Sequence, residues 1–281
     1  MRVGLIGTGN MGTLLTESFL EKKVFAEDQI HITNRSLPKA YRLKARYPGI
    51  HVEKDAASVI ARCLLVFLCV KPRDIPPLLA AIQPVLTGRH CLISLASPVT
   101  PAQLERLCPC PCIRAVPSIL NRAGEGCFLI TYGPKAANRW KKRIEALLTP
   151  VAETIETDDA TIRPASDIVG CGPAFFAFLA RQFAEAAAKE TRLSQRDALE
   201  LTGRMLVGLG KILKAGYYSL EELEKRVRVP GGMTDEGLKV LEAYPVEEMF
   251  CGIFRATHRK FREEQGHLQG ELLPPDDPSL S

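Results

Sequence analysis

A glycine-rich segment near the N-terminus constrains the fold of this chain most strongly. Residues Val3 to Ile6 form a short apolar run, and Gly7-Thr8-Gly9-Asn10-Met11-Gly12 follows with the pattern G-x-G-x-x-G. A helical pattern with Leu14 and Phe19 comes next. In such a strand–turn–helix unit, the first glycine allows the tight bend, the second lets a pyrophosphate approach the backbone, and the third allows the helix to pack closely. The segment therefore predicts a dinucleotide site at a helix N-terminus; the alternative is a structural glycine-rich turn.

Length and composition indicate a globular, enzyme-like protein. The chain has 281 residues, enough for two domains, with 46% hydrophobic and 25% charged residues. Its net charge of +5 is spread along the chain, which favours an anionic cofactor and does not indicate nucleic acid as a partner. No apolar run reaches the length of a membrane span, and the first strand begins at residue 2, which leaves no room for a signal peptide. We therefore expect a cytoplasmic protein, no membrane partner, and reduced cysteines.

Three of the nine cysteines form the pattern C-P-C-P-C at Cys108, Cys110 and Cys112. Alternation places them on one face of an extended segment. A metal site usually has C-x-x-C spacing and needs a fourth ligand. We therefore expect these thiols to pack in the interior, and we predict no metal site.

Strand and helix patterns alternate over residues 1–157. The strand-like runs are Arg2 to Ile6, Gln29 to Thr33, Leu64 to Val70, Cys91 to Leu95, Cys112 to Val116, Cys127 to Tyr132 and Glu153 to Glu156. Helical patterns such as Leu14 to Lys23, Lys39 to Tyr47 and Asn138 to Leu148 separate several of them. This alternation predicts an α/β fold with a Rossmann-type, doubly wound parallel sheet in residues 1–157. We expect an all-α domain in residues 158–268 and a disordered tail in residues 269–281.

The end of the second strand bears on the choice of cofactor. An acidic residue there would bind the ribose 2′-hydroxyl of NAD, whereas this chain has Asn34, Arg35 and Ser36. A guanidinium and a hydroxyl group suit the 2′-phosphate of NADP. These residues predict NADP(H), although Arg35 could also be a solvated loop charge.

Other strand ends lie at the same edge of the predicted sheet, where ligands bind in open α/β folds. We expect Ser97 and Ser118 to line the nicotinamide and substrate end. Lys71 is placed to meet the cofactor, or it is a solvated strand-end lysine. The expected cofactor-binding residues are Ile6, Gly7, Thr8, Gly9, Asn10, Met11, Gly12, Asn34, Arg35, Ser36, Cys69, Val70, Lys71, Pro72 and Leu95.

The helical half begins with a helix that is apolar on nearly all sides, from Pro173 to Phe183. Such a helix is expected to be buried, and a second subunit could cover it. Ser194 and Ser219 are predicted helix caps, the latter forming a capping box with Glu222. The last long helix carries an apolar stripe from Met249 to Phe261.

A second glycine-rich loop, Val229-Pro230-Gly231-Gly232-Met233-Thr234, lies between two predicted helices. Two glycines can bring backbone N–H groups together, and the helix that follows adds its positive end. The loop is therefore an anion nest suited to a carboxylate, with Thr234 offering a hydroxyl group. The alternative is a helix-breaking turn in which Thr234 is only an N-cap.

Several motifs in order resemble the pyrroline-5-carboxylate reductase family, over most of the chain. Gly7 to Gly12 matches the cofactor turn of that family, and Pro230-Gly231-Gly232-Met233-Thr234 resembles its C-terminal signature. Further matches are Cys69-Val70-Lys71-Pro72 with Ala-Val-Lys-Pro, Gly170 to Phe175 with Gly-Ser-Gly-Pro-Ala-Tyr, and Arg114 to Ser118 with Arg-x-Met-Pro-Asn.

This resemblance implies hydride transfer from NADPH to the C=N carbon of a cyclic imine acid, which gives proline. It implies a dimer formed through the C-terminal helices. It implies substrate binding by Gly231, Gly232, Met233 and Thr234, in addition to Ser97 and Ser118. Thr234 would be catalytic, through a hydrogen bond to the ring nitrogen or by protonating it.

The departures from the family are concentrated at the substrate end. The family's serine before Pro-Gly-Gly is Val229, the asparagine of Met-Pro-Asn is Ser118, and Pro98 removes a backbone donor at the sheet edge. This drift of the substrate motifs resembles the reductase-like late competence proteins of the ComER type, whose Val-Pro-Ser and Thr-Asn-Arg segments are similar to Val116-Pro117-Ser118 and Thr33-Asn34-Arg35. The alternative function is therefore binding of NADP(H) without useful turnover.

Two further hypotheses concern substrate choice. A 3-hydroxyacid dehydrogenase would need a lysine on the helix after the sheet domain, and residues 170–183 contain none. Arg226 and Arg228, beside the anion nest, would favour a more anionic substrate, or they are solvated charges at a helix end.

Overall fold

The computed structural model describes residues 1–270 and residue 272. The described chain forms two compact units, residues 1–171 together with the part from residue 257 onward, and residues 172–256. The predicted domain boundary at residue 157 stays a prediction. Most of the tail that was predicted to be disordered lies outside the described residues.

The first unit contains an eight-stranded sheet in the order β3-β2-β1-β4-β5-β6-β7-β8. The strands are β1 (Val3–Ile6), β2 (Ile30–Thr33), β3 (His51–Val52), β4 (Leu65–Leu68), β5 (Cys91–Ser94), β6 (Cys112–Val116), β7 (Cys127–Tyr132) and β8 (Glu153–Glu156). All seven predicted strands are present. The two-residue strand β3 was not predicted, because it is too short to show a hydrophobic period.

The sheet departs from the predicted parallel arrangement at one place, where β6 and β7 pair antiparallel. Residues 117–126 connect these two strands and contain only the 3₁₀ turn η4 (Ile119–Ala123). Parallel neighbours need a crossover of about a dozen residues or more, usually a helix, so this short connection can only reverse the chain direction.

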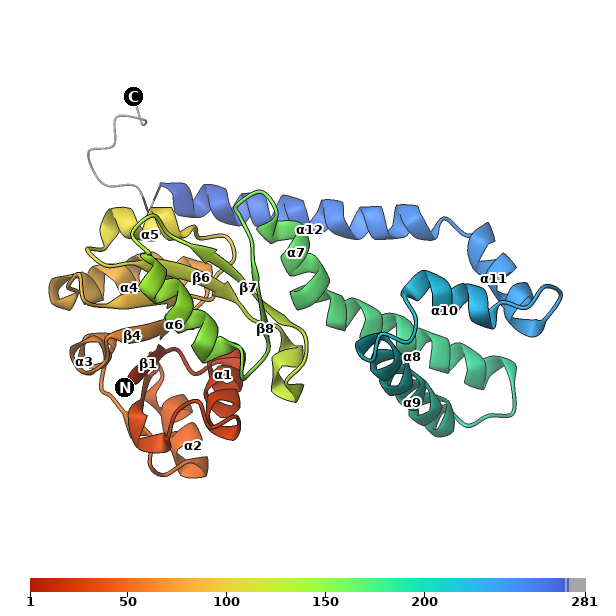
Figure 1. Ribbon diagram of the computed structural model, residues 1–281, viewed down its shortest axis with the longest axis horizontal. Coiled ribbons are helices and arrows are strands. Elements are labelled where there is room, and N and C mark those ends of the chain that lie inside the picture. Colours follow the sequence, from red (N-terminus) through yellow and green to blue (C-terminus); the bar gives the residue numbers. More distant parts are fainter. Residues whose placement is uncertain (271, 273–281) are drawn as a thin grey trace. The chain divides into compact units, whose positions relative to one another are not determined.

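Helices cover both faces of the sheet (Figure 1). They are α1 (Asn10–Glu21), α2 (Leu37–Arg46), α3 (Ala56–Arg62), α4 (Ile75–Ile82), α5 (Pro101–Leu107), α6 (Asn138–Leu148) and α7 (Ile162–Ser166). Alternation along β1 separates two apolar clusters. Leu5 packs in the cluster that contains residues of α1, α2 and α6, whereas Ile6 packs in the cluster that contains residues of α3, α4 and α5. The predicted Rossmann-type, doubly wound architecture is confirmed.

The C-P-C-P-C segment packs in the interior, as its alternation predicts. Cys108, Cys110 and Cys112 are all buried, and they belong to the same apolar cluster as Ile6. Burial of the Cys91 thiol, on the neighbouring strand, raises its pKa. Because Cys108, Cys110 and Cys112 are buried in an apolar cluster, their side chains pack as part of the core.

The second unit is helical, with α8 (Gly172–Glu190), α9 (Gln195–Lys214), α10 (Leu220–Val227), α11 (Met233–Ala243) and the first part of α12 (Val246–Gln269). Residues 172–256 contain no strand. The predicted caps are present: Ser194 accepts a hydrogen bond from the Asp197 N–H, and Ser219 forms a capping box with Glu222.

The expectation that the helix from Pro173 is buried is wrong for the single chain. Phe176, Phe178 and Phe183 of α8 are 61%, 55% and 65% exposed. On the neighbouring α9, Leu201 and Val207 are also more than half exposed. Exposed apolar side chains on two neighbouring helices are typical of an interaction surface. In the described part of the chain, no helix has both the length and the apolarity to cross a bilayer.

Candidate active site

The glycine turn after β1 has the geometry of a phosphate cradle. Gly7 has a φ of +104°, which favours glycine, and a Cβ there would lie 2.5 Å from the Cys69 carbonyl oxygen. A Cβ on Gly12 would lie 2.0 Å from the Gly7 carbonyl oxygen. A Cβ on Gly9 would meet nothing within 4 Å. Gly7 and Gly12 are therefore required by the fold, whereas Gly9 leaves open space in front of the N-terminus of α1.

Backbone hydrogen bonds hold the predicted cofactor residues along one edge of the sheet. The Cys69 N–H donates to the Ile6 carbonyl at 2.8 Å, and the Leu95 N–H donates to the Leu68 carbonyl at 3.2 Å. These bonds continue the β1–β4–β5 ladder past the ends of the strands. The carboxyl ends of three parallel strands thus meet beside the glycine turn, where α/β folds bind ligands.

The β2–α2 loop is joined to the turn by Asn34. Its side-chain amide donates to the Thr8 hydroxyl at 2.8 Å, and its carbonyl oxygen accepts from the Ser36 N–H at 3.2 Å. Asn34 therefore shapes the loop. Arg35 is 88% exposed on its side chain and pairs with Asp74 at 3.0 Å. Such an exposed pair is weak, so the guanidinium remains available to a phosphate.

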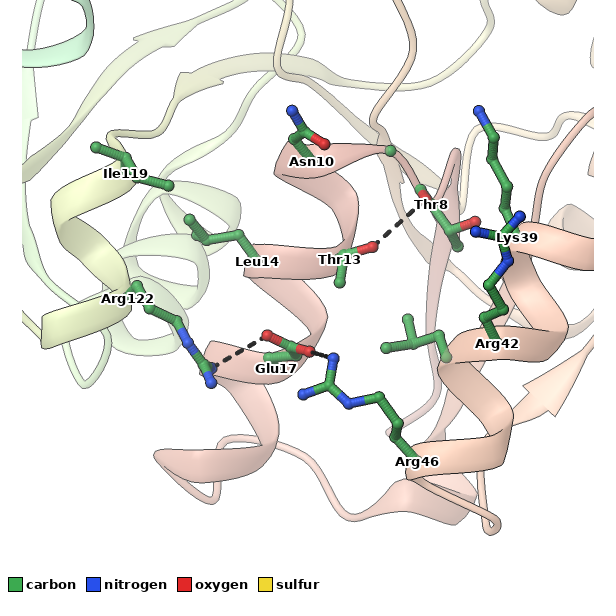
Figure 2. Close-up of a pocket in the computed structure, with 12 residues that line it drawn as sticks. Thr8, Asn10, Thr13, Leu14, Glu17, Lys39, Arg42, Arg46, Ile119 and Arg122 are labelled. Carbon is green, nitrogen blue, oxygen red and sulfur yellow. Dashed lines mark hydrogen bonds and ion pairs between the residues drawn. The ribbon is translucent and has the colours of Figure 1, made fainter. Parts of the chain in front are cut away.

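A cavity of about 690 Å³ adjoins the turn (Figure 2). Thr8, Gly9 and Asn10 form one end of it, and cationic side chains of α2 and η4 line its walls. Figure 2 shows Arg46 and Arg122 reaching toward Glu17, and both pair with this buried carboxylate.

Two other cations of this cavity, Lys39 and Arg42, have no ion-pair or hydrogen-bond partner for their side chains in the described part of the chain. Neither residue belongs to the predicted set of cofactor-binding residues. The signal was available, because they are three residues apart on the helix that follows Arg35. They make this end of the cavity attractive to a phosphate.

At the far end of the sheet edge, Ser97 and Ser118 are held by neighbouring groups. The Ser97 carbonyl accepts from the buried Arg114 at 3.1 Å, and Arg114 also donates to Thr131 and Asp159. Burial lowers the pKa of Arg114, and the carboxylate of Asp159 partly counteracts this shift. Ser118 is fully buried, and its hydroxyl donates to the Val169 carbonyl at 2.6 Å. The Ser118 hydroxyl therefore acts in the fold, besides the substrate role predicted for it.

The loop before α11 differs in detail from the predicted anion nest. The Gly231 N–H donates to the Asp235 carboxylate at 3.1 Å, and the Gly232 N–H donates to the Val229 carbonyl at 2.8 Å. Both glycine amides are therefore engaged within the loop. Gly232 is the N-cap of α11, so Thr234 is not a cap; it lies exposed in the first turn. The amides of Met233 and Thr234, at the helix start, are the donors that an anion would meet.

The charges beside this loop pair with one another. Arg228 donates to Asp235 at 2.8 Å and also pairs with Glu242, whereas Arg226 lies 5.1 Å from the centre of the Tyr218 ring. The hypothesis that these arginines attract a more anionic substrate is therefore weakened for Arg228. The Gly231 N–H, Arg228 and Lys239 together lower the pKa of Asp235 to about 2.

We expect this loop to become less ordered as the pH falls. Because the pKa of Asp235 is depressed from 3.8 to about 2, its stabilising effect is complete above about pH 4 and is lost as the pH falls toward 2. Exchange of the Gly231 amide with solvent, corrected for its intrinsic pH dependence, should accelerate over that range. The Asp235→Asn variant should show no such step. A step that persists in this variant would mean that another group controls the loop.

The fold and these sites define a dinucleotide-binding protein of the oxidoreductase class. Residues 2–98 match the family model "NADP oxidoreductase coenzyme F420-dependent", and residues 159–264 match "Pyrroline-5-carboxylate reductase dimerisation". ComE operon protein 4 of Bacillus subtilis (strain 168) is 43% identical to this chain, over 94% of this chain and 96% of that protein. Pyrroline-5-carboxylate reductase 3 of the same organism is 27% identical, over 92% and 95%.

A solved pyrroline-5-carboxylate reductase from Coxiella burnetii has a TM-score of 0.83 at 25% identity, covering 94% of this chain and 98% of that one. The chain therefore belongs to the pyrroline-5-carboxylate reductase family. The predictions of family, fold class and NADP(H) as the cofactor of this class are confirmed.

Proposed function

We propose that this protein is an NADPH-dependent reductase of a cyclic imine acid, and that pyrroline-5-carboxylate, which is reduced to proline, is its substrate. Hydride adds to the C=N carbon, and the ring nitrogen then needs a proton. Thr234, an exposed residue in the first turn of α11, hydrogen-bonds or protonates that nitrogen through its hydroxyl group. The amides of Met233 and Thr234 receive the substrate carboxylate.

The observation that carries this proposal is the combination of two helix starts in one chain of this family. One follows the open Gly9 of the cofactor turn, and the other follows Gly231-Gly232 and carries Thr234. Each presents backbone donors and a positive helix end, which suit a pyrophosphate and a small carboxylate respectively.

For the cofactor, Lys39 and Arg42 join Arg35 and Ser36 around the 2′-phosphate of NADPH. Replacing Lys39 and Arg42 together by glutamine should weaken NADPH binding about tenfold or more and leave NADH binding unchanged, because only NADPH carries the extra phosphate. Fluorescence titration with both cofactors measures this difference.

Arg46→Gln is the matched control, because Arg46 lines the same cavity but is already paired with Glu17. It should change the two affinities by similar factors. Equal losses of NADPH and NADH affinity in the Lys39/Arg42 variant would place the 2′-phosphate elsewhere.

The exposed apolar faces of α8 and α9 support a homodimer that forms through the helical domain. We propose that this domain extends over residues 158–268. A second copy of the chain would bury Phe176, Phe178 and Phe183. A cytoplasmic location remains our expectation for this protein.

The second candidate is a protein that binds NADP(H) with little turnover. One observation favours it: the Gly231 and Gly232 amides are engaged within their own loop. One assay separates the candidates, namely NADPH oxidation with pyrroline-5-carboxylate and related cyclic imine acids. Steady oxidation supports the reductase, whereas NADPH binding without oxidation across the panel supports the alternative.

A further inference from the structure

A buried carboxylate lies where the chain leaves the first compact unit. Asp167 begins a π-helical turn, Asp167–Cys171, between α7 and α8, and its side chain is fully buried. The chain passes into the second unit after Cys171 and returns to the first at Thr257. π-helical turns are rare, and they occur frequently at functional sites.

Asp167 contacts both α7, which precedes the π-helical turn, and α12, in which the chain returns to the first unit. It forms an ion pair with Arg163 of α7, one turn earlier, and accepts a hydrogen bond from the Thr257 hydroxyl of α12 at 2.8 Å. His258 Nε2 lies 3.6 Å away. Arg163 in turn lies 5.3 Å from the centre of the Phe261 ring. One carboxylate thus connects the π-helical turn with the start of the returning segment.

The same turn holds one residue at the sheet edge. The Val169 carbonyl, inside the π-helical turn, accepts the hydroxyl hydrogen of Ser118 at 2.6 Å. Ser118 follows β6, accepts a hydrogen bond from the Leu120 N–H, and is the N-cap of η4. A displacement of the π-helical turn would therefore move the carboxyl end of β6.

Stability alone is a poor explanation for this arrangement. Replacing a buried ion pair by apolar side chains is often neutral or stabilising, so a buried charge is weak evidence of a stabilising role. A carboxylate with several directional partners does select one backbone conformation, which an apolar side chain cannot do. The candidate role of Asp167 is thus conformational.

We propose that Asp167 is a positioning residue of the reductase site, which holds the π-helical turn so that Val169 places Ser118 at the substrate end of the sheet edge. This inference rests on the proposed function, because it assumes that the edge beside Ser118 binds the nicotinamide and the imine acid. It assigns Asp167 no contact with either ligand.

The test compares Asp167→Asn with Glu105→Gln. Glu105 is also a buried carboxylate of the first unit, and it accepts hydrogen bonds from the Cys112 and Lys135 amides, at the opposite end of β6 from Ser118. Both variants lose a buried charge. We expect Asp167→Asn to lower kcat about ten- to a hundredfold, because a misplacement of about 1 Å has effects of this size, with the NADPH Kd within about twofold of wild type. Glu105→Gln should leave kcat unchanged.

Hydrogen–deuterium exchange provides a readout that does not depend on turnover. Amides of residues 118–121 and 167–172 should exchange faster in Asp167→Asn than in Glu105→Gln. If the wild-type protein does not oxidise NADPH, the proposed function fails while this comparison still tests the positioning role. If Asp167→Asn does not fold, Thr257→Val takes its place, because it removes one hydrogen bond to Asp167 and keeps the Arg163 pair and the side-chain shape.

Unchanged exchange at residues 118–121 in the folded variant overturns the proposal. So does an equal fall of kcat in the Asp167 and Glu105 variants, since this would reflect general destabilisation. Faster exchange confined to the Asp167 or Thr257 variant supports it.

Discussion

Replacing Thr234 by valine is expected to lower kcat about ten- to a thousandfold, the usual range for loss of a general acid. The hydroxyl lies in the first turn of α11, beside amides that lack intrahelical acceptors. Valine keeps the β-branched shape and removes only the group that can donate to the ring nitrogen. Steady-state NADPH oxidation measures the loss, with the NADPH Kd from fluorescence expected to stay within about twofold.

Thr234→Ser is the control, because it retains a hydroxyl and should keep most of the rate. A valine variant that turns over at the wild-type rate would show that the proton comes from another donor, such as water. The geometry of the loop does not depend on the Thr234 side chain, because Asp235 and Val229 hold the two glycine amides. A loss of rate would therefore report on chemistry rather than on folding.

Placing alanine at Gly12 is expected to reduce both the stability of the protein and its affinity for NADPH. The new Cβ would lie 2.0 Å from the Gly7 carbonyl oxygen, so either α1 or the turn must move. Overpacking of this kind typically costs about 1–3 kcal/mol, and displacing α1 also takes its N-terminal amides away from the pyrophosphate. We expect NADPH affinity to fall more than about a hundredfold and the thermal midpoint to fall by several degrees.

Gly9→Ala separates these two effects. A Cβ on Gly9 meets no protein atom within 4 Å, and the residue has an extended backbone with φ of −78°. The folded protein should therefore tolerate alanine, with a thermal midpoint close to that of wild type. Because the methyl group occupies the approach expected for the pyrophosphate, NADPH affinity should fall about tenfold or more. An alanine variant that binds NADPH normally would mean that the pyrophosphate lies elsewhere.

Much of the fold could be predicted from local patterns. Apolar runs such as Cys127 to Tyr132 became strands with the predicted bounds, and Ser194 and Ser219 capped helices where their spacing indicates. Pairing direction was harder, because β6 and β7 look like their neighbours in composition. Their antiparallel pairing follows from the short connection between them.

The candidate site was predictable in part. Gly7 and Gly12 occupy positions that only glycine fits, which is why a spacing motif could predict the turn. Lys39 and Arg42 were missed because their one signal, a three-residue spacing on the helix that follows Arg35, is shared by many solvated surface charges. Asp167 was missed because a single aspartate between Ser166 and Ile168 gives no indication of its burial or of its partners.

The cofactor turn, the alternation of the sheet domain and the family could be predicted from short motifs, because each motif consists of residues close together in the chain. The engaged hydrogen-bond donors could be identified only in the folded chain. The Gly231 and Gly232 amides donate within their own loop, and the Ser118 hydroxyl donates to the Val169 carbonyl. Asp167 accepts a hydrogen bond from Thr257, which lies ninety residues further along the chain. A hydrogen bond is set by the position and direction of two atoms in space, and spacing along the chain does not specify either for residues so far apart.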